Sequence, residues 1–195
     1  MDLIFYDLRE DDFDGVIKLG SEVHGENYVG HSLLDKIYRK SCLLGLCCSK
    51  VVYEGTREEG KLVGFRLTYA PGQWEIDEWC STEKWEVPPE KVCYFKSNTV
   101  DENYRGKGIG SALLQMSIAT VKQMGAVAGI THIWMLSPGG SAYRYFTRAG
   151  GKDIRVWPKR WAGDYEKDGY LCCVHGKDCV CDATEMILFF GEQNE

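Results

Sequence analysis

The chain has 195 residues and a net charge of −6, with an isoelectric point near 5.3. Its length suits one domain, and its 44% apolar and 27% charged residues are proportions typical of globular proteins in water. The acidic balance argues against a general nucleic-acid surface, which is basic, and favours a cationic partner such as an amine.

The sequence also predicts a cellular location. It contains no apolar run of the roughly 18 residues that a membrane-spanning helix needs. Residues 1–7 carry acids rather than the basic and apolar segments of a secretion signal. Nine cysteines in such a chain indicate reduced thiols or metal ligands rather than disulfides. We therefore expect a cytoplasmic monomer or homodimer that binds no membrane and no nucleic acid.

The first half of the chain predicts two helices and three strands. Residues 3–6 suit a short strand, and the acids of residues 11–14 favour the start of a helix because they stabilise its positive end. A second helix is expected over residues 32–40. Residues 49–55 and 61–69 are expected to form two strands joined by a hairpin turn.

Residues 73–90 are rich in tryptophan and acids, and we treat them as an insertion. They contain half of the six tryptophans: Trp74, Trp79 and Trp85. Two interpretations remain open. The segment is either a surface loop whose indoles complete the core, or a lid that uses indoles and carboxylates to bind a cationic ligand. The acids that would serve such a lid are Glu75, Asp77 and Glu78.

A glycine-rich turn joins an expected strand, residues 91–100, to an expected helix, residues 111–124. A helix that begins at such a turn directs unpaired N–H groups, and the positive end of its dipole, at one spot that favours a phosphate. The Walker loop is excluded because no lysine separates Gly110 from Ser111. The glycine spacing also differs from the dinucleotide fingerprint G-x-G-x-x-G.

The spacing instead matches Arg-x-x-Gly-x-Gly, filled by Arg105, Gly108 and Gly110 and preceded by Val100 and Tyr104. This string resembles the acyl-CoA pyrophosphate loop of the GNAT superfamily of N-acyltransferases. The resemblance implies a single domain over the whole chain with an α/β (α+β) fold. Such a fold has a mixed, mostly antiparallel sheet with helices on both faces, in the order β-α-α-β-β-β-α-β-α-β-β.

The resemblance also implies acetyl-CoA as the co-substrate. Its pantetheine arm would pair with the free backbone edge of the strand at residues 91–100, as an added strand does. Its pyrophosphate would bind the N–H groups of the glycine-rich turn. The residues expected to bind the cofactor are Asn98, Thr99, Val100, Arg105, Gly106, Lys107, Gly108, Ile109, Gly110 and Ser111.

The implied activity is transfer of an acetyl group directly to an amine, expected to be small and cationic, within a ternary complex. Two alternatives remain open: a catalytically silent acyl-CoA-binding module, and an enzyme that acetylates proteins or peptides. Residues 141–150 are similar to the last helix of the family, but Phe146 stands where the family has the tyrosine that protonates the leaving thiolate. We take Tyr143 as the replacement acid, ahead of Tyr145.

The base that accepts the proton of the attacking ammonium is left open by the sequence. The candidates are Glu75, Asp77, Glu78, a chain of water molecules, and His132 on an expected strand over residues 131–137.

The last third is expected to contain a cysteine-rich hairpin over residues 167–190, with strands at residues 167–174 and 183–190. Its turn is bracketed by Cys172, Cys173, His175, Cys179 and Cys181. Thiolate and imidazole suit tetrahedral zinc, but the spacing lacks paired C-x-x-C knuckles. We favour free thiols over zinc or a disulfide between Cys172 and Cys181, and we assign no metal ligand.

Overall fold

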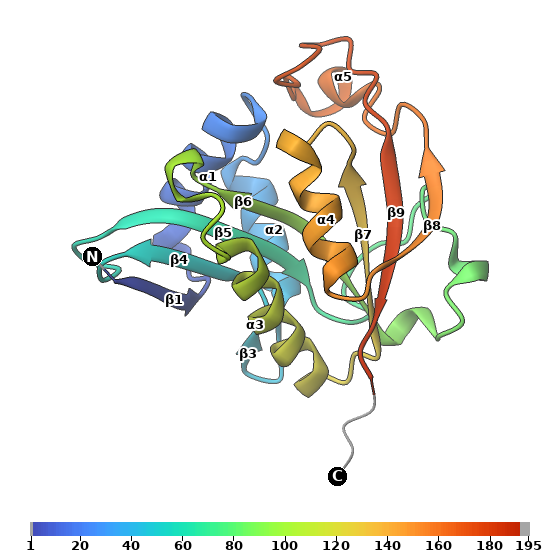
Figure 1. The fold of residues 1–195 in the computed structure, drawn as a ribbon, viewed down its shortest axis with the longest axis horizontal. Helices are drawn as coiled ribbons and strands as arrows, with labels where there is room; N and C mark the ends of the chain where they lie inside the picture. Colours follow the sequence, from blue (N-terminus) through green and yellow to red (C-terminus); the bar gives the residue numbers. More distant parts are fainter. Residues whose placement is uncertain (1, 192–195) are drawn as a thin grey trace.

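A seven-stranded sheet forms the centre of the protein. The computed structural model describes residues 2–191, and Figure 1 shows their fold. The strands lie in the order β1-β4-β5-β6-β7-β9-β8, and among these neighbours only β6 and β7 run parallel. Their bounds are β1 Leu3–Asp7, β4 Lys50–Glu54, β5 Lys61–Tyr69, β6 Val92–Val100, β7 Ala128–Trp134, β8 Lys152–Trp157 and β9 Ala183–Phe189.

Helices cover both faces of the sheet. One face carries α1 (Phe13–His24) and α2 (His31–Ser41), and the other carries α3 (Ile109–Gln123) and α4 (Ser141–Arg148), as Figure 1 shows. The first pair buries its apolar side over β4 and β5, and the second pair packs over β4 to β7. The remaining elements are the hairpin of β2 Cys42–Leu43 and β3 Leu46–Cys47 and the short helix α5 Asp164–Asp168.

The expected fold class is confirmed: the sheet is mixed and mostly antiparallel, with helices on both faces. The main elements follow the expected order when the β2–β3 hairpin, α5 and the single 3₁₀ turns are set aside. Within residues 2–191, no helix combines the length and the apolar character that crossing a bilayer requires.

The sheet opens between its two parallel strands. β6 and β7 pair only through residues 92–94 and 128–130. A bulge follows at once in β6, where Lys96 has no partner on β5. β7 pairs along its whole length with β9 instead. The edge of β6 that faces away from β5 over residues 96–100 therefore has no strand partner in the described part of the chain.

The tryptophan-rich segment, residues 73–90, packs over β6, β7 and β9. Trp85 is fully buried against Ile130, and Trp74 stacks on Tyr94 with ring centroids 4.9 Å apart. The interpretation that these tryptophans complete the core is therefore confirmed for Trp74 and Trp85.

The strand expected at residues 131–137 begins three residues earlier, as β7. Its second residue, Gly129, packs directly on Phe95: a Cβ atom at position 129 would lie 2.3 Å from a ring carbon. The glycine thus belongs inside the strand because two strands and an aromatic ring approach closely there, not because the chain turns.

The expected strand over residues 167–174 is wrong, and so is the cysteine-rich hairpin built on it. α5 ends within this range, Gly169 follows with a φ of +70°, and a tight turn then joins Cys172 to Gly176. Extended pairing cannot run through a left-handed residue and a tight turn. The partner of β9 is β8 instead, and the cysteines lie in the long loop between these two strands.

A buried carboxyl ties the tryptophan-rich segment to the sheet. Glu185, on β9, is fully buried. Its Oε1 accepts hydrogen bonds from the Ser81 backbone N–H at 2.9 Å and the Trp85 indole at 3.0 Å. Its Oε2 accepts from the Trp157 indole at 3.2 Å. Two buried donors and one half-buried donor therefore depend on this one side chain.

We predict that Glu185→Gln lowers the free energy of unfolding by about 1–3 kcal/mol, because its amide nitrogen would face a buried donor. Urea unfolding measures the difference. Glu166→Gln, at an exposed position of α5, is the matched control and should leave stability unchanged. Equal midpoints for the two variants would contradict the prediction.

Candidate active site

A cavity of about 700 Å³ lies where β6 and β7 diverge. Its walls come from the end of α1, β6, β7, the start of α3, α4 and the loop between β8 and β9. Figure 1 shows how these segments, distant in the sequence, come together beside β6. All expected cofactor residues except Lys107 line it: Asn98, Thr99, Val100, Arg105, Gly106, Gly108, Ile109, Gly110 and Ser111.

The glycine-rich turn presents backbone donors to this cavity. Gly106 and Gly108 have φ values of +77° and +80°, a conformation that favours glycine. Gly108 caps α3, and its carbonyl accepts the first helical bond from the N–H of Ala112. The N–H groups of residues 106–111 have no acceptor within residues 2–191. The turn is thus a ready anion site at the positive end of a 15-residue helix.

Close packing explains the third glycine. A Cβ atom at Gly110 would lie 2.9 Å from the side-chain nitrogen of Asn98 on β6. Gly110 therefore lets the first turn of α3 contact β6 directly, which brings the free N–H groups and the free strand edge into one site.

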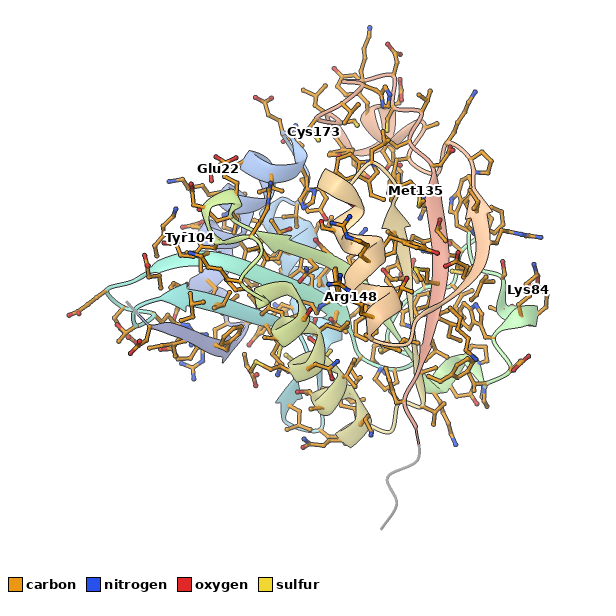
Figure 2. All side chains as sticks on the ribbon, in the orientation of Figure 1. Glu22, Lys84, Tyr104, Met135, Arg148 and Cys173 are labelled. Atoms are coloured by element: carbon orange, nitrogen blue, oxygen red, sulfur yellow. The ribbon has the colours of Figure 1, made fainter. Side chains whose placement is uncertain are left out.

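Cationic side chains surround the same mouth of the cavity. Arg105 comes from the turn, and Arg144 and Arg148 come from one face of α4, where residues four apart are neighbours. Figure 2 labels Arg148 on this helix. Sequence reasoning missed both α4 arginines, although their spacing of four was a signal for them. Lys107 instead places its Nζ 4.7 Å from the centre of the Tyr104 ring.

The structure reverses our order of preference for the two tyrosines of α4. Tyr143 does not line the cavity; its hydroxyl donates to Asp153 at 2.8 Å, and that hydrogen bond raises the pKa of Tyr143. Tyr145 lines the cavity. Phe146 is fully buried against Phe95, so the apolar residue at this position serves the core.

A buried arginine holds the Tyr145 side chain. Arg66, on β5, is 1% exposed, and its Nη2 donates to the Tyr145 hydroxyl oxygen at 2.5 Å. The guanidinium also lies over the Phe95 ring at 5.1 Å. Because the phenol oxygen is the acceptor in this bond, its own proton remains free to be donated into the cavity.

The end of α1 forms the opposite wall. The His24 Nε2 lies 2.8 Å from the Thr99 hydroxyl, and the Tyr28 hydroxyl lies 2.6 Å from that of Ser97. The two rings stack at 4.2 Å. Burial, with a smaller contribution from the nearby Arg105 charge, lowers the pKa of His24 to about 4, so the imidazole is neutral at pH 7.

The loop between β8 and β9 supplies a polar and aromatic wall. Its cavity-lining residues are Arg160, Trp161, Asp164, Asp168 and Tyr170, which Lys96 and Trp134 join from β6 and β7. Burial raises the pKa of Asp164. Carboxylates and cations therefore face the same space from different elements, and sequence reasoning had assigned none of them.

The proposed lid acids lie elsewhere. Glu75 pairs with Lys36 and Lys40, both at 3.3 Å, and Asp77 pairs with Arg160 at 3.3 Å. Neither these two residues nor Glu78 lines the cavity. The lid interpretation of these acids is therefore wrong: Asp77 contacts the cavity wall only through Arg160, and the other two acids do not line it.

His132 lines the cavity, but both of its nitrogens are engaged. The Nδ1 lies 3.0 Å from the Tyr94 hydroxyl, and the Nε2 lies 2.7 Å from the carbonyl oxygen of Trp79. These two bonds give His132 a structural role between β6, β7 and residues 73–90.

Four of the five clustered metal-ligand candidates come together. The ligand atoms of Cys172, His175, Cys179 and Cys181 all lie within 4.8 Å of one another. Cys173, which Figure 2 labels, is exposed and does not belong to this group. The three buried cysteines also line the cavity, next to Trp134, Trp161 and Tyr170.

The sequence places the protein in a family. The sequence model of the Acetyltransferase (GNAT) family matches residues 9–150, which is most of the chain. The chain therefore belongs to the GNAT acetyltransferase family. No curated protein sequence matches it at a significant level.

Solved structures share the fold of this chain. NAA60 from Arabidopsis thaliana in complex with a bisubstrate analogue has a TM-score of 0.70 and 14% identity, over 98% of this chain and 100% of that one. The putative acetyltransferase yncA from Salmonella typhimurium, solved with acetyl-CoA, has a TM-score of 0.66 and 16% identity, over 100% of this chain and 98% of that one. The ribosomal-protein-S18-alanine N-acetyltransferase from Escherichia coli has a TM-score of 0.65 and 13% identity, over 100% of this chain and 99% of that one. At these identities the likeness shows the fold.

The shifted pKa of His24 predicts how stability depends on pH. Because the folded-state pKa is about 4 and the ordinary value is 6.5, the unfolded chain takes up a proton between these values while the folded chain does not. Stability is therefore lost as the pH falls from 6.5 to 4. We predict that the wild type loses up to about 3 kcal/mol more than His24→Gln over this window. Urea unfolding at both ends of the window tests this, and parallel losses in the two proteins would contradict it.

Proposed function

We propose that the protein is an acetyl-CoA-dependent N-acetyltransferase that transfers the acetyl group directly to a small amine in a ternary complex, within one domain. The observation that carries the proposal is the juxtaposition of the unpartnered N–H groups at residues 106–111 with the free edge of β6, along one cavity. A pyrophosphate and an extended amide chain need these two features side by side.

Acetyl-CoA would bind along the side of α3 and α4. Its pyrophosphate would sit on the glycine-rich turn, with Arg105, Arg144 and Arg148 adding positive charge. Its pantetheine amides would pair with the backbone of β6 near Asn98 and Val100. The thioester would then lie where β6 and β7 part, between Tyr145 on one side and the α1 wall on the other.

Positioning of two bound reactants supplies much of the acceleration in such a site, up to about 7–11 kcal/mol in the best intramolecular cases. The amine attacks the thioester carbonyl, the carbon–sulfur bond breaks, and the thiolate takes a proton. Tyr145 is the acid we assign to that last step, because its O–H faces the cavity while Arg66 holds its oxygen. The buried Arg66 charge also favours the developing thiolate.

The acceptor would enter from the side of α1 and the β8–β9 loop. Asp164 and Asp168 suit its ammonium group, and the indoles of Trp134 and Trp161 suit an alkyl chain or a cation. Lys96 and Arg160 also face this space, so an amine that carries a carboxylate fits as well as a diamine. For the proton of the ammonium group, the cavity offers Asp164 and the neutral His24.

A protein or peptide acceptor is the second candidate. It is favoured by the fold shared with the ribosomal-protein-S18-alanine N-acetyltransferase of Escherichia coli. The walled cavity with charges of both signs favours the small amine.

Measurements of acetyl-CoA binding and turnover test whether the protein uses acetyl-CoA as its co-substrate. We predict that acetyl-CoA at about a hundred times its dissociation constant stabilises the protein by roughly 2.7 kcal/mol in a thermal-shift titration. Arg144→Ala combined with Arg148→Ala should weaken binding, because two phosphate-facing charges are lost, whereas Lys122→Ala near the other end of α3 should not. Absence of any shift would contradict the proposal.

Turnover separates the candidate acceptors. Free thiol released from acetyl-CoA is followed with diamines, amino acids and short peptides as acceptors. Release with small amines supports the proposed enzyme, and release with peptides alone supports the second candidate. Tight cofactor binding without thiol release from any acceptor would favour the silent module.

We predict that Tyr145→Phe lowers kcat by about 100-fold at saturating substrates, because the thiolate loses its acid. Tyr143→Phe is the matched control: it removes a hydroxyl two residues away that hydrogen-bonds to Asp153 outside the cavity. Its kcat should stay within about twofold. A Tyr145→Phe enzyme with unchanged kcat over the pH profile would remove the acid assignment.

A further inference from the structure

The long loop between β8 and β9 closes one side of the cavity with little regular structure to support it. Its one helix, α5, has five residues, and no strand is assigned between residues 158 and 182. The loop reaches across to the end of α1: the Tyr170 hydroxyl donates to the His24 carbonyl, and the Leu171 N–H donates to the Glu26 carbonyl, both at 3.0 Å. Such a segment needs a further constraint to keep one conformation.

The same loop brings three thiols and one imidazole to a single point. The Sγ atoms of Cys172 and Cys181 are 3.8 Å apart, and the Cys181 Sγ lies 3.3 Å from the Nδ1 of His175. With zinc–sulfur bonds of 2.3 Å, the edge of a tetrahedral site is about 3.8 Å between sulfurs. The Cys179 sulfur completes the set, and all four ligand atoms lie within 4.8 Å of one another.

Local backbone geometry arranges the first two ligands. Cys172 and Gly176 exchange two backbone hydrogen bonds, of 3.1 and 2.8 Å, and Gly176 has a φ of +62°. This tight turn folds His175 back towards Cys172. Cys179 and Cys181 then approach from the chain that enters β9.

We propose that Cys172, His175, Cys179 and Cys181 bind one Zn²⁺ ion in a structural site that holds the β8–β9 loop over the cavity. Three cysteines and one histidine are a ligand set that zinc prefers, and four protein ligands leave no open position for catalysis. This revises the preference for free thiols that the sequence suggested.

The two other readings of the cluster fit less well. His175 is exposed to solvent, yet its Nδ1 contacts the buried Sγ of Cys181. Free core thiols would not explain this contact. A disulfide between Cys172 and Cys181 would not explain why the ligand atoms of Cys179 and His175 lie at the same point. One metal ion accounts for all four groups.

The site also has a consequence for the cavity. Trp134, Trp161 and Tyr170 pack directly on the three cysteines, and all three aromatic residues line the cavity wall. A metal at the cluster therefore fixes the wall that would face the acceptor, which links metal content to the order of this loop.

The experiment is metal analysis of protein purified without a polyhistidine tag and without added metal. About one zinc per chain is expected for the wild type and for Cys173→Ser, which removes the neighbouring thiol that lies outside the cluster. Cys181→Ser and His175→Ala should bind zinc at least about tenfold more weakly. His175 is exposed, so His175→Ala keeps the test valid if Cys181→Ser fails to fold.

Cobalt gives a second readout that does not depend on activity. Zinc is removed with a chelator and Co²⁺ alone is added back. Thiolate-to-cobalt charge-transfer absorption, with the strong visible bands of four-coordinate cobalt, is expected for the wild type and Cys173→Ser, and His175→Ala should need at least about tenfold more Co²⁺ to develop it. Purified wild type without metal and without this spectrum would overturn the proposal. So would a chain mass lower by two hydrogens, which indicates a disulfide. Neither result bears on acetyl-CoA binding, which is measured separately.

Discussion

The early separation of β6 from β7 is the constraint on which the rest of the structure depends. The two strands share three residue pairs, and then the bulge at Lys96 turns β6 away while β7 continues along β9. Unpaired strand edges are normally covered, because exposed N–H and C=O groups attract other chains. Here the free edge lines a cavity, and it is therefore available to a ligand with amide groups of its own.

Each wall of the cavity is built from elements that this separation places on different faces of the sheet. α3 and α4 bring backbone donors and arginines to one side, which suits the anionic half of a cofactor. α1 and the β8–β9 loop bring a neutral histidine, aromatic rings and carboxylates to the other side. Two ligands of different charge would therefore meet where the strands part. Under the proposed binding mode, the hydrogen-bonded pair Arg66 and Tyr145 would lie on the cofactor side of that meeting point.

Several residues show how far sequence reasoning reaches. The glycine-rich turn was identified from Arg105, Gly108 and Gly110. Local chemistry requires glycine at two of these positions: a positive φ at Gly108 and close approach to Asn98 at Gly110. Tyr143 and Tyr145 could not be ranked in the same way. Helical geometry shows only that two side chains two residues apart point to different sides of the helix. Which of these sides faces the cavity depends on how α4 packs. The α4 arginines were missed for the same reason.

The sequence by itself determined the fold class and the family, because the string around Arg105, Gly108 and Gly110 resembles the GNAT pattern, which implies both. Periodicity and short-range backbone chemistry determined the place of the glycine-rich turn between a strand and a helix. Only the tertiary structure decided the opposite wall. The β8–β9 loop has no periodicity to read, so the expected strand at residues 167–174 was wrong. Its cysteines lack a familiar spacing, yet Cys172 and Cys181 meet across the loop at 3.8 Å. Contacts of that kind arise from the path of the whole chain, which no local pattern encodes.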